Sequence, residues 1–205
     1  MGHDKATAEH DGDGSPYSGF PSNAVGLTVP DIDVDRLPPA LLRELRASHV
    51  GETVAVALYD GVAAGSRDPD LLTFARSHRL VEQVHLRLWS ALLPPGRRSR
   101  IMPVWRASGR LMGWLPARAG PEAFYAVVGA VESWVDGHYA GQIALSRRLG
   151  APEGLIALMQ ACREDEARHS RDAARLACRP GVVARLLAAL AVAGSRAGVA
   201  VARWV

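Results

Sequence analysis

The sequence predicts an all-α protein with four long helices, a short amphipathic connecting helix and a C-terminal fifth helix. Three observations support this fold class. No stretch alternates apolar and polar residues with the period of two that a half-buried β-strand requires. Ala, Leu, Val and Arg, which are mostly helix formers, dominate the 205 residues, and 48% of the chain is hydrophobic. Prolines and glycines divide the chain into segments of helical length.

Each expected helix is bounded by proline or glycine. Proline suits the first turn of a helix, where its missing N–H needs no partner, and prolines precede all four long segments. Asp68 is also expected to cap the second long helix with its side chain. Glycine or proline follows each long segment and stops it. The expected helices span approximately residues 38–65, 69–93, 102–115, 121–149, 152–179 and 181–205.

The first 37 residues differ in composition from the rest. They hold two basic residues, Lys5 and Arg36, against seven acidic ones, and they are rich in Gly, Ser and Pro. We expect residues 1–37 to form a disordered acidic tail and not a secretory or mitochondrial leader, and residues 38–205 to form one domain. That domain holds 22 basic and 14 acidic residues. Such a surface is compatible with an anionic membrane or nucleic acid, and equally with no partner.

The two cysteines and the apolar C-terminus bear on the compartment. Cys162 and Cys178 form no C-x-x-C motif, so we expect reduced thiols in a cytoplasmic protein. The segment 181–205 is the most apolar in the chain, but three arginines interrupt it. We therefore expect no clean membrane-spanning helix there.

The pattern E-x-x-H occurs twice, in the second and in the fourth long segment. Glu82 precedes His85 by three positions, and Glu166 precedes His169 by three positions. Residues i and i+3 project from the same face of a helix, so each pair can bind one metal ion together. The first and third long segments each carry a glutamate near their middle.

Those two glutamates, Glu52 and Glu132, are placed to join the E-x-x-H pairs. The midpoint between Glu52 and Glu82 is residue 67, inside the first expected turn, and the midpoint between Glu132 and Glu166 is residue 149, beside the second. Antiparallel hairpins therefore set the members of each couple at the same height. The order Glu, E-x-x-H, Glu, E-x-x-H is that of di-iron carboxylate proteins with a ferritin-like four-helix bundle.

The proposed metal ligands are thus Glu52, Glu82, His85, Glu132, Glu166 and His169. Four carboxylates facing a core would repel one another, and two divalent ions relieve that repulsion. Oxygen and imidazole ligands favour iron or manganese over zinc. Asp172, one turn after His169, is either a residue that orients a ligand or an exposed charge. The alternative for the whole set is that the glutamates lie on solvated helix faces.

Five groups of residues follow one another along the chain in a distinctive order. They are residues 45–52 with 57–59, the first E-x-x-H pair, 102–105 with Gly109, Val131 and Glu132 with His138, Tyr139 and Gln142, and 164–166 with His169 and Asp172. In these residues the chain resembles the demethoxyubiquinone hydroxylases, ferritin-like di-iron monooxygenases of ubiquinone biosynthesis. The resemblance spans about residues 43–200 and departs from the family pattern at Ser48, Val50 and Gln83, none of which is a proposed ligand.

The resemblance implies hydroxylation of a demethoxy polyprenyl-benzoquinol. It implies two iron ions (Fe²⁺/Fe³⁺) as cofactor and O₂ as co-substrate; the reductant is not given by the sequence, and NADH is one candidate. His138 and Tyr139 are candidate catalytic residues for proton or electron delivery, with core packing as the alternative. Expected partners are the polyprenyl quinone and a membrane surface, with no nucleic acid; a homo-oligomer or a complex of quinone-biosynthesis proteins is compatible.

A polyprenyl substrate implies contact with a membrane, and the nearly exclusive use of Arg over Lys indicates a bacterial origin. We therefore expect a peripheral protein on the cytoplasmic face of a bacterial inner membrane. The amphipathic segment 102–115 and the last helix combine apolar residues with Arg and Trp, as helices lying in a membrane interface do; the alternative is that the last helix packs on the bundle. The competing hypothesis is a ferritin-like iron-binding or peroxide-scavenging protein without an organic substrate. An apolar channel between the first and third long helices would favour the hydroxylase.

Overall fold

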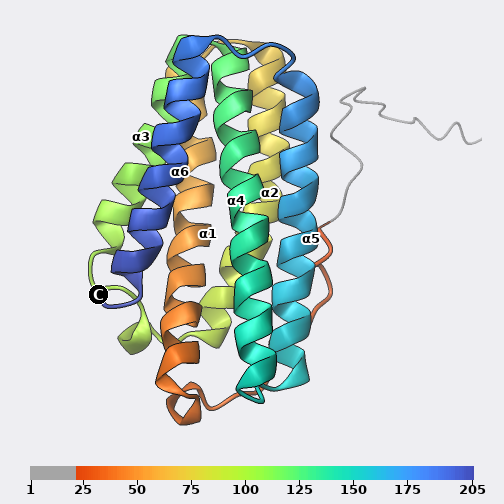
Figure 1. The fold of residues 1–205 in the computed structure, drawn as a ribbon, viewed down its shortest axis with the longest axis vertical. Helices are drawn as coiled ribbons and strands as arrows, with labels where there is room; N and C mark the ends of the chain where they lie inside the picture. The colour runs from red at the N-terminus through yellow and green to blue at the C-terminus, as the bar shows by residue number, and fades with distance from the viewer. Residues whose placement is uncertain (1–21) are drawn as a thin grey trace, which may run out of the picture.

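The computed structural model describes residues 22–205. Within this range it contains helices and no strand, which confirms the all-α fold class (Figure 1). All six expected helices are present, and the long ones begin and end within a few residues of the expected positions. They are α1 (Pro39–Gly65), α2 (Pro69–Leu92), α3 (Met102–Ala119), α4 (Pro121–Arg148), α5 (Glu153–Leu176) and α6 (Val182–Ala202), with short 3₁₀ turns η1 (Val34–Arg36) and η2 (Pro95–Arg97).

Local signals in the sequence explain these boundaries. Asp68 caps α2, because its side chain accepts a hydrogen bond of 2.8 Å from the backbone N–H of Leu71. The turn between α4 and α5 contains Gly150 with φ +64°, a left-handed conformation that glycine adopts without steric cost. Both hairpins are therefore closed by short turns, as the spacing of the glutamates requires.

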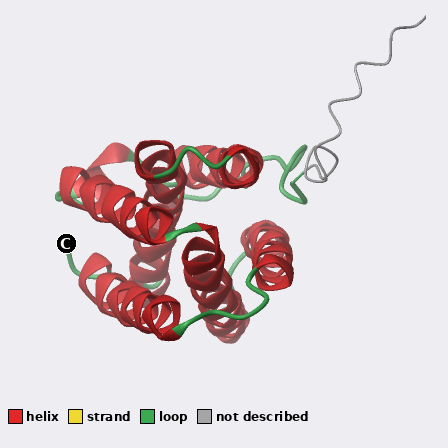
Figure 2. Ribbon diagram, turned by 90° about the horizontal axis from the view of Figure 1, so that it is seen from above, coloured by secondary structure: helices red, strands yellow, loops and turns green. Residues whose placement is uncertain are grey.

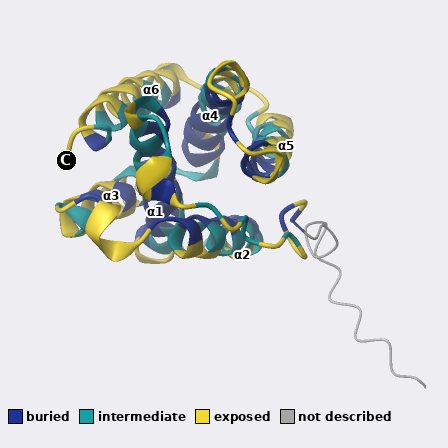
Figure 3. Ribbon diagram, turned by 90° about the horizontal axis from the view of Figure 1, so that it is seen from below, coloured by how far each residue is buried: buried dark blue, intermediate teal, exposed yellow. Residues whose placement is uncertain are grey.

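The helices form two layers of three. Seen from below, α3, α1 and α2 make up one layer, and α6, α4 and α5 make up the other (Figure 3). The view from above shows the same two layers (Figure 2). Helices α1, α2, α4 and α5 form the four-helix bundle, and α3 and α6 extend the two layers on one side.

Two apolar clusters fill the bundle, one toward each end. The first includes Leu45, Trp89, Tyr139 and Met159, and the second includes Tyr59, Phe74, Phe124 and Ala173. On each of the four bundle helices, the proposed ligands lie in the sequence between the residues of the two clusters. Apolar layers therefore close the ligand region at both ends.

Glycines allow α3 to pack closely against α1. Gly61 and Gly65 on α1 lie against the α3 backbone at Arg110 and Trp114. Gly109 and Gly113 on α3 lie against the α1 backbone at Val54 and Leu58, and a Cβ on any of the four glycines would lie too close to the opposite backbone. At Gly113 it would overlap the carbonyl oxygen of Leu58. On each helix the two glycines are four positions apart and lie on one face. They let the backbones of α1 and α3 approach closely along that face, so that α3 packs as the third helix of its layer. It is longer than the short connecting helix that the sequence predicted.

Residues 22–37 differ from the expected disordered tail. Val34 is 5% exposed and belongs to the first apolar cluster, and Leu27, Val29, Ile32 and Leu37 pack against it. Burial of these apolar side chains offsets the entropy lost when the segment is ordered. The acidic composition of the segment gave no indication of this packing. The remainder of the expected tail, residues 1–21, lies outside the described residues.

Helix α6 is mostly exposed although it is apolar. Within the described residues it is the one helix long and apolar enough to cross a membrane by length and composition. The expectation was that its arginines interrupt any clean span, yet the helix is apolar enough on average despite Arg185 and Arg196. Leu186 and Leu190 on α6 are 58% and 68% exposed, and Leu111 on the neighbouring α3 is 58% exposed. The α3–α6 side thus presents an apolar surface.

Candidate metal centre

The four bundle helices bring the six proposed ligands together in the core. Each helix turns its apolar stripe inward, and the ligands lie on those stripes. All six residues are at most 4% exposed. The alternative that these glutamates are solvated is therefore wrong. The set comprises Glu52 from α1, Glu82 and His85 from α2, Glu132 from α4, and Glu166 and His169 from α5.

The six residues form two overlapping groups that could each hold a metal ion. Glu52 and His85 belong to one group and Glu132 and His169 to the other. Glu82 and Glu166 belong to both, and within each group the potential ligand atoms lie within 4.8 Å of one another. Two positions that share two carboxylates are the arrangement expected of a carboxylate-bridged pair of ions.

The two histidines, His85 and His169, each place a ring nitrogen beside carboxylate oxygens. The Nδ1 atom of His169 lies 2.9 Å from Oε1 of Glu82, and Nδ1 of His85 lies 3.4 Å from carboxylate oxygens of both Glu52 and Glu166. Burial opposes charge on His169, but Glu166 and Glu82 outweigh it and raise its pKa to about 9. Without metal, protons on the imidazoles therefore compensate part of the negative charge.

Burial raises the pKa of Glu52 and Glu132, the two carboxylates that belong to one ligand group each. Burial and the nearby Glu166 and Glu82 raise the pKa of Glu52 to about 8, although His85 acts in the opposite direction. Burial and the same two carboxylates raise the pKa of Glu132 well above its usual range. Burial also disfavours charge on Glu82, but His169 and His85 outweigh it and hold that pKa low. Four carboxylates in one buried space thus lack sufficient counter-charge.

Unsatisfied polar atoms at the centre support a metal-binding role. Among the described side chains, both carboxylate oxygens of Glu82, Oε2 of Glu166 and Nδ1 of His85 and His169 are buried and make no hydrogen bond, although ion pairs connect them to one another. Buried polar atoms in native proteins almost always have partners. These five atoms come from the two ligand groups together, so the donor set fits two cations with oxygen and nitrogen ligands.

An apolar cavity of about 400 Å³ adjoins the cluster. It lies between α1, α3, α4 and α6, and the carboxylates Glu52, Glu132 and Glu166 line it. Most of the other lining residues are apolar, including Val54 and Leu58 from α1, Met112 from α3, Val135 from α4, and Leu187 and Val199 from α6. An apolar cavity therefore lies between the first and third long helices, as the hydroxylase hypothesis expects, and α3 and α6 contribute to its wall.

The comparison with protein families agrees with this geometry. Residues 39–202 match the model of the family described as "Ubiquinone biosynthesis protein COQ7". The chain belongs to this family. The match covers all six helices, which confirms the resemblance seen in the sequence.

Several curated relatives of this chain carry the name 3-demethoxyubiquinol 3-hydroxylase. The protein from Paracidovorax citrulli is 34% identical over 165 residues, which is 77% of each chain. That from Acidovorax sp. is 34% identical over 169 residues, again 77% of each chain. That from Rhodospirillum rubrum is 36% identical over 148 residues, covering 66% of this chain and 67% of its own. The chain is therefore an enzyme of the hydroxylase class.

Two tyrosines donate hydrogen bonds to Glu52 and Glu132, the two carboxylates that belong to one ligand group each. The hydroxyl of Tyr139 donates to Oε1 of Glu52, and the hydroxyl of Tyr59 donates to Oε1 of Glu132 at 3.4 Å. Burial and the neighbouring carboxylates raise both tyrosine pKa values well above 10, so both hydroxyls stay protonated. The structure thus places Tyr139, a candidate catalytic residue, in contact with the cluster.

His138, the other candidate catalytic residue, belongs to neither ligand group. Its ring stacks on Trp134 at 5.4 Å, and its Nε2 lies 3.9 Å from Oε2 of Glu44. Glu44 is in turn held by Arg203 from the end of α6 at 2.9 Å. His138 lines the cavity, so the structure assigns it to the cavity wall and away from the ligands.

Asp165 holds a proposed ligand, His85, by a hydrogen bond, and Asp172 contacts no proposed ligand directly. Oδ2 of Asp165 accepts a hydrogen bond of 2.9 Å from Nε2 of His85, so the Nδ1 atom faces the carboxylates. A carboxylate behind a ligating histidine fixes its tautomer and orientation. Asp172 lies 3.8 Å from Nε2 of His78, whose ring contacts that of His169. Sequence reasoning missed Asp165, although its position directly before the second E-x-x-H pair was a signal.

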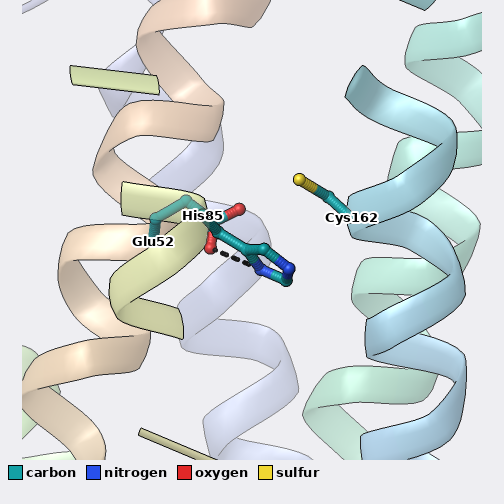
Figure 4. Close-up of side chains that lie close together, drawn as sticks. All are labelled: Glu52, His85 and Cys162. Atoms are coloured by element: carbon teal, nitrogen blue, oxygen red, sulfur yellow. Dashed lines mark ion pairs between the residues drawn. The ribbon is translucent and has the colours of Figure 1, made fainter. Parts of the chain in front are cut away.

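Cys162 is a third side chain beside Glu52 and His85. Figure 4 shows the ion pair between Glu52 and His85, with the thiol of Cys162 pointing toward them from α5. Potential ligand atoms of the three residues lie within 4.8 Å of one another. Burial is the main cause that raises the pKa of Cys162 to about 12, so the free thiol adds no charge to the centre. Cys162 and Cys178 are both free, as expected.

Proposed function

We propose that this COQ7-family enzyme is a di-iron, O₂-dependent hydroxylase of a demethoxy polyprenyl-benzoquinol in ubiquinone or related quinone biosynthesis. The single observation that carries the proposal is the apolar cavity whose wall includes three of the proposed ligands. A hydroxylase of an apolar ring needs such a cavity next to its metal ions. The names of the relatives supply the substrate class.

The proposed ligands divide between two iron ions. Glu52 and His85 would hold one ion, Glu132 and His169 the other, and Glu82 and Glu166 would bridge them. Bound iron supplies the reduction of O₂, which the side chains of the protein cannot perform. A hard donor set of four carboxylates and two imidazoles suits this metal.

The protein's own residues organise the space around the ions. The Tyr139 and Tyr59 hydroxyls hold Glu52 and Glu132 in place by hydrogen bonds, and they retain their protons there. The apolar wall excludes water from the reacting ring, which protects the chemistry from side reactions. No nucleotide-binding motif occurs in the sequence, so the electrons come from an external reductant, for which NADH is a candidate.

The membrane supplies the substrate in this proposal. The apolar side of α3 and α6 covers the cavity, and exposed arginines accompany it, among them Arg106, Arg110 and Arg196. Apolar residues that enter the lipid interface and arginines at the headgroups would seat the enzyme on the cytoplasmic face of a bacterial membrane. The polyprenyl tail can then remain in lipid while the ring enters the cavity.

The activity is tested with the iron-loaded protein. The reduced protein is mixed with a demethoxy-benzoquinol and isotopically labelled O₂, and the product is analysed by mass spectrometry. We expect one labelled oxygen atom in the ring, and rescue of a bacterial strain deficient in this hydroxylation. Intact iron binding without labelled product and without rescue would favour the iron-binding alternative, which has no organic substrate.

The membrane surface is tested by flotation with vesicles that contain anionic phospholipid. Leu111→Glu and Leu186→Glu place a charge on the α3–α6 side and should reduce vesicle binding by about tenfold or more, since a buried charge is costly in lipid. Leu80→Glu is the matched control. Leu80 is 63% exposed on α2, which lies in the layer that does not contain α6 and is separated from α3 by α1 (Figure 3). Equal loss in all three variants would argue against this surface.

A further inference from the structure

The segment of residues 22–37 lies outside the part of the chain that matches the family model, which begins at residue 39. It runs along α5 from the grey trace toward the start of α1 (Figure 1). Ala24 is 1% exposed, and Pro30 contacts α5 where it approaches Gly154. We refer to this segment as the strap. It is built into the fold and is not a loose extension.

The beginning of the strap contacts one residue of α5 with two hydrogen bonds. The hydroxyl of Ser22 donates to Oδ2 of Asp165 at 2.5 Å, and the backbone N–H of Asn23 donates to Oδ1 at 3.0 Å. The backbone N–H of Ala24 donates to the Ser22 hydroxyl at 3.0 Å, which directs the hydroxyl proton toward Asp165. Both Ser22 and Asp165 are buried.

Asp165 connects the strap to the metal centre. Its Oδ2 atom, which accepts from Ser22, also accepts from Nε2 of His85 at 2.9 Å. Nδ1 of the same ring faces the carboxylates of Glu52 and Glu166. The direction of that nitrogen therefore depends on Asp165, and two of the groups that hold Asp165 come from the strap. Arg168 contributes a further contact at 2.8 Å.

We propose that Ser22 is a positioning residue for the metal centre, and that docking of the strap and metal binding strengthen each other. The inference rests on the proposed metal centre. Ser22 holds Asp165, Asp165 holds His85, and His85 meets the ion in the orientation it needs. Because coupling between two binding events is reciprocal, a metal ion that favours this orientation also favours the docked strap by the same factor.

The first test measures metal affinity. Co²⁺ is titrated into the full-length metal-free protein, and its visible absorption reports binding. Ser22→Ala should weaken Co²⁺ binding by about tenfold, the lower end of the effect of residues that support a ligand. Thr28→Ala removes a hydroxyl from an exposed strap position and should stay within twofold of the unsubstituted protein. Ser22→Thr retains a hydroxyl and should restore most of the affinity.

The second test measures the strap directly. Amide hydrogen exchange of residues 22–37 should slow by about tenfold when Co²⁺ binds, and this protection should be largely lost in Ser22→Ala. A strap that serves only to cover apolar surface would exchange at the same rate with and without Co²⁺.

The two proposals fail in different ways. If the unsubstituted protein binds no Co²⁺, the metal centre itself is refuted, and this inference with it. If it binds Co²⁺ and Ser22→Ala binds equally well with unchanged exchange of the strap, the metal centre stands and the role of Ser22 is refuted. Equal weakening by Ser22→Ala and Thr28→Ala also refutes it, because the effect would then not pass through Asp165.

Discussion

Glu82 on α2 and Glu166 on α5 each belong to both groups of potential metal ligands. They come from different hairpins, 84 positions apart in the numbering of the chain, and both are at most 2% exposed. Both metal positions formed by the six proposed ligands therefore depend on these two carboxylates, whereas Glu52 and Glu132 each belong to only one of the two positions.

This sharing predicts different metal contents for different variants. The unsubstituted protein should bind about two iron ions per chain. Glu132→Gln or Glu52→Gln should leave about one, and Glu82→Gln or Glu166→Gln well below one, as measured by elemental analysis after removal of free metal. Glu164→Gln, at an exposed position, is the control and should retain two. Equal loss in all four ligand variants would contradict a bridging arrangement.

Metal binding should release protons and strengthen as pH rises. Without metal, Glu52 with a pKa of about 8 and His169 with a pKa of about 9 are mainly protonated at pH 7, and both must lose the proton to bind a metal. The apparent affinity for Co²⁺ should therefore increase between pH 6 and pH 9. Calorimetry in buffers of different ionisation enthalpy counts the released protons, and a pH-independent affinity would contradict the prediction.

The contact between α1 and α3 should not tolerate a side chain at Gly113. A methyl group there would overlap the carbonyl oxygen of Leu58, so Gly113→Ala should lower the free energy of unfolding by about 2–3 kcal/mol. Gly137 on α4 is the matched control, since a Cβ there meets nothing within 4 Å. Gly137→Ala should be neutral or stabilise by up to about 1 kcal/mol. Denaturant unfolding of both variants checks this, and equal effects would contradict the close helix contact.

His49 should make the protein less stable in mild acid. Burial, with Arg98 and Arg106 nearby, lowers the pKa of His49 from 6.5 to about 4, while its Nε2 pairs with Ser90 at 3.2 Å. Between these two pH values the unfolded chain binds a proton at His49 and the folded protein does not. Stability is therefore lost as pH falls from 6.5 toward 4, by up to about 3 kcal/mol for this residue.

The variant His49→Gln isolates that contribution. The difference in unfolding free energy between the two proteins should shift in favour of the variant as pH falls through this range. Thr53→Ala, one turn along α1, removes no titratable group, so its effect should be the same at each pH. A difference between His49→Gln and the unsubstituted protein that does not depend on pH would contradict the prediction.

The sequence determined the helices and the identity of the clustered ligands. Proline starts, the Asp68 cap and the glycine turn at residue 150 act over a few residues, so they can be read without knowledge of the fold. The spacing of Glu82 with His85 and of Glu166 with His169 places each pair on one helix face, and short turns set the hairpins in register. All six predicted ligands are buried together for these local reasons.

Tertiary packing decided the surroundings of the ligands. Asp165 behind His85, Ser22 behind Asp165, and Tyr59 beside Glu132 are contacts between segments far apart in the chain, and no periodicity indicates them. His138 and Tyr139 are adjacent in sequence, yet only Tyr139 contacts a ligand, because consecutive residues on a helix point in directions about 100° apart.

The cavity depends on tertiary structure most of all. Its wall combines side chains from α1, α3, α4 and α6 with Glu166 from α5, and its volume depends on how closely α3 approaches α1 at Gly109 and Gly113. Local sequence determines which face of a helix is apolar. The space left between helices depends on side chains and backbones that meet only after the chain has folded, and the sequence pattern alone does not specify it.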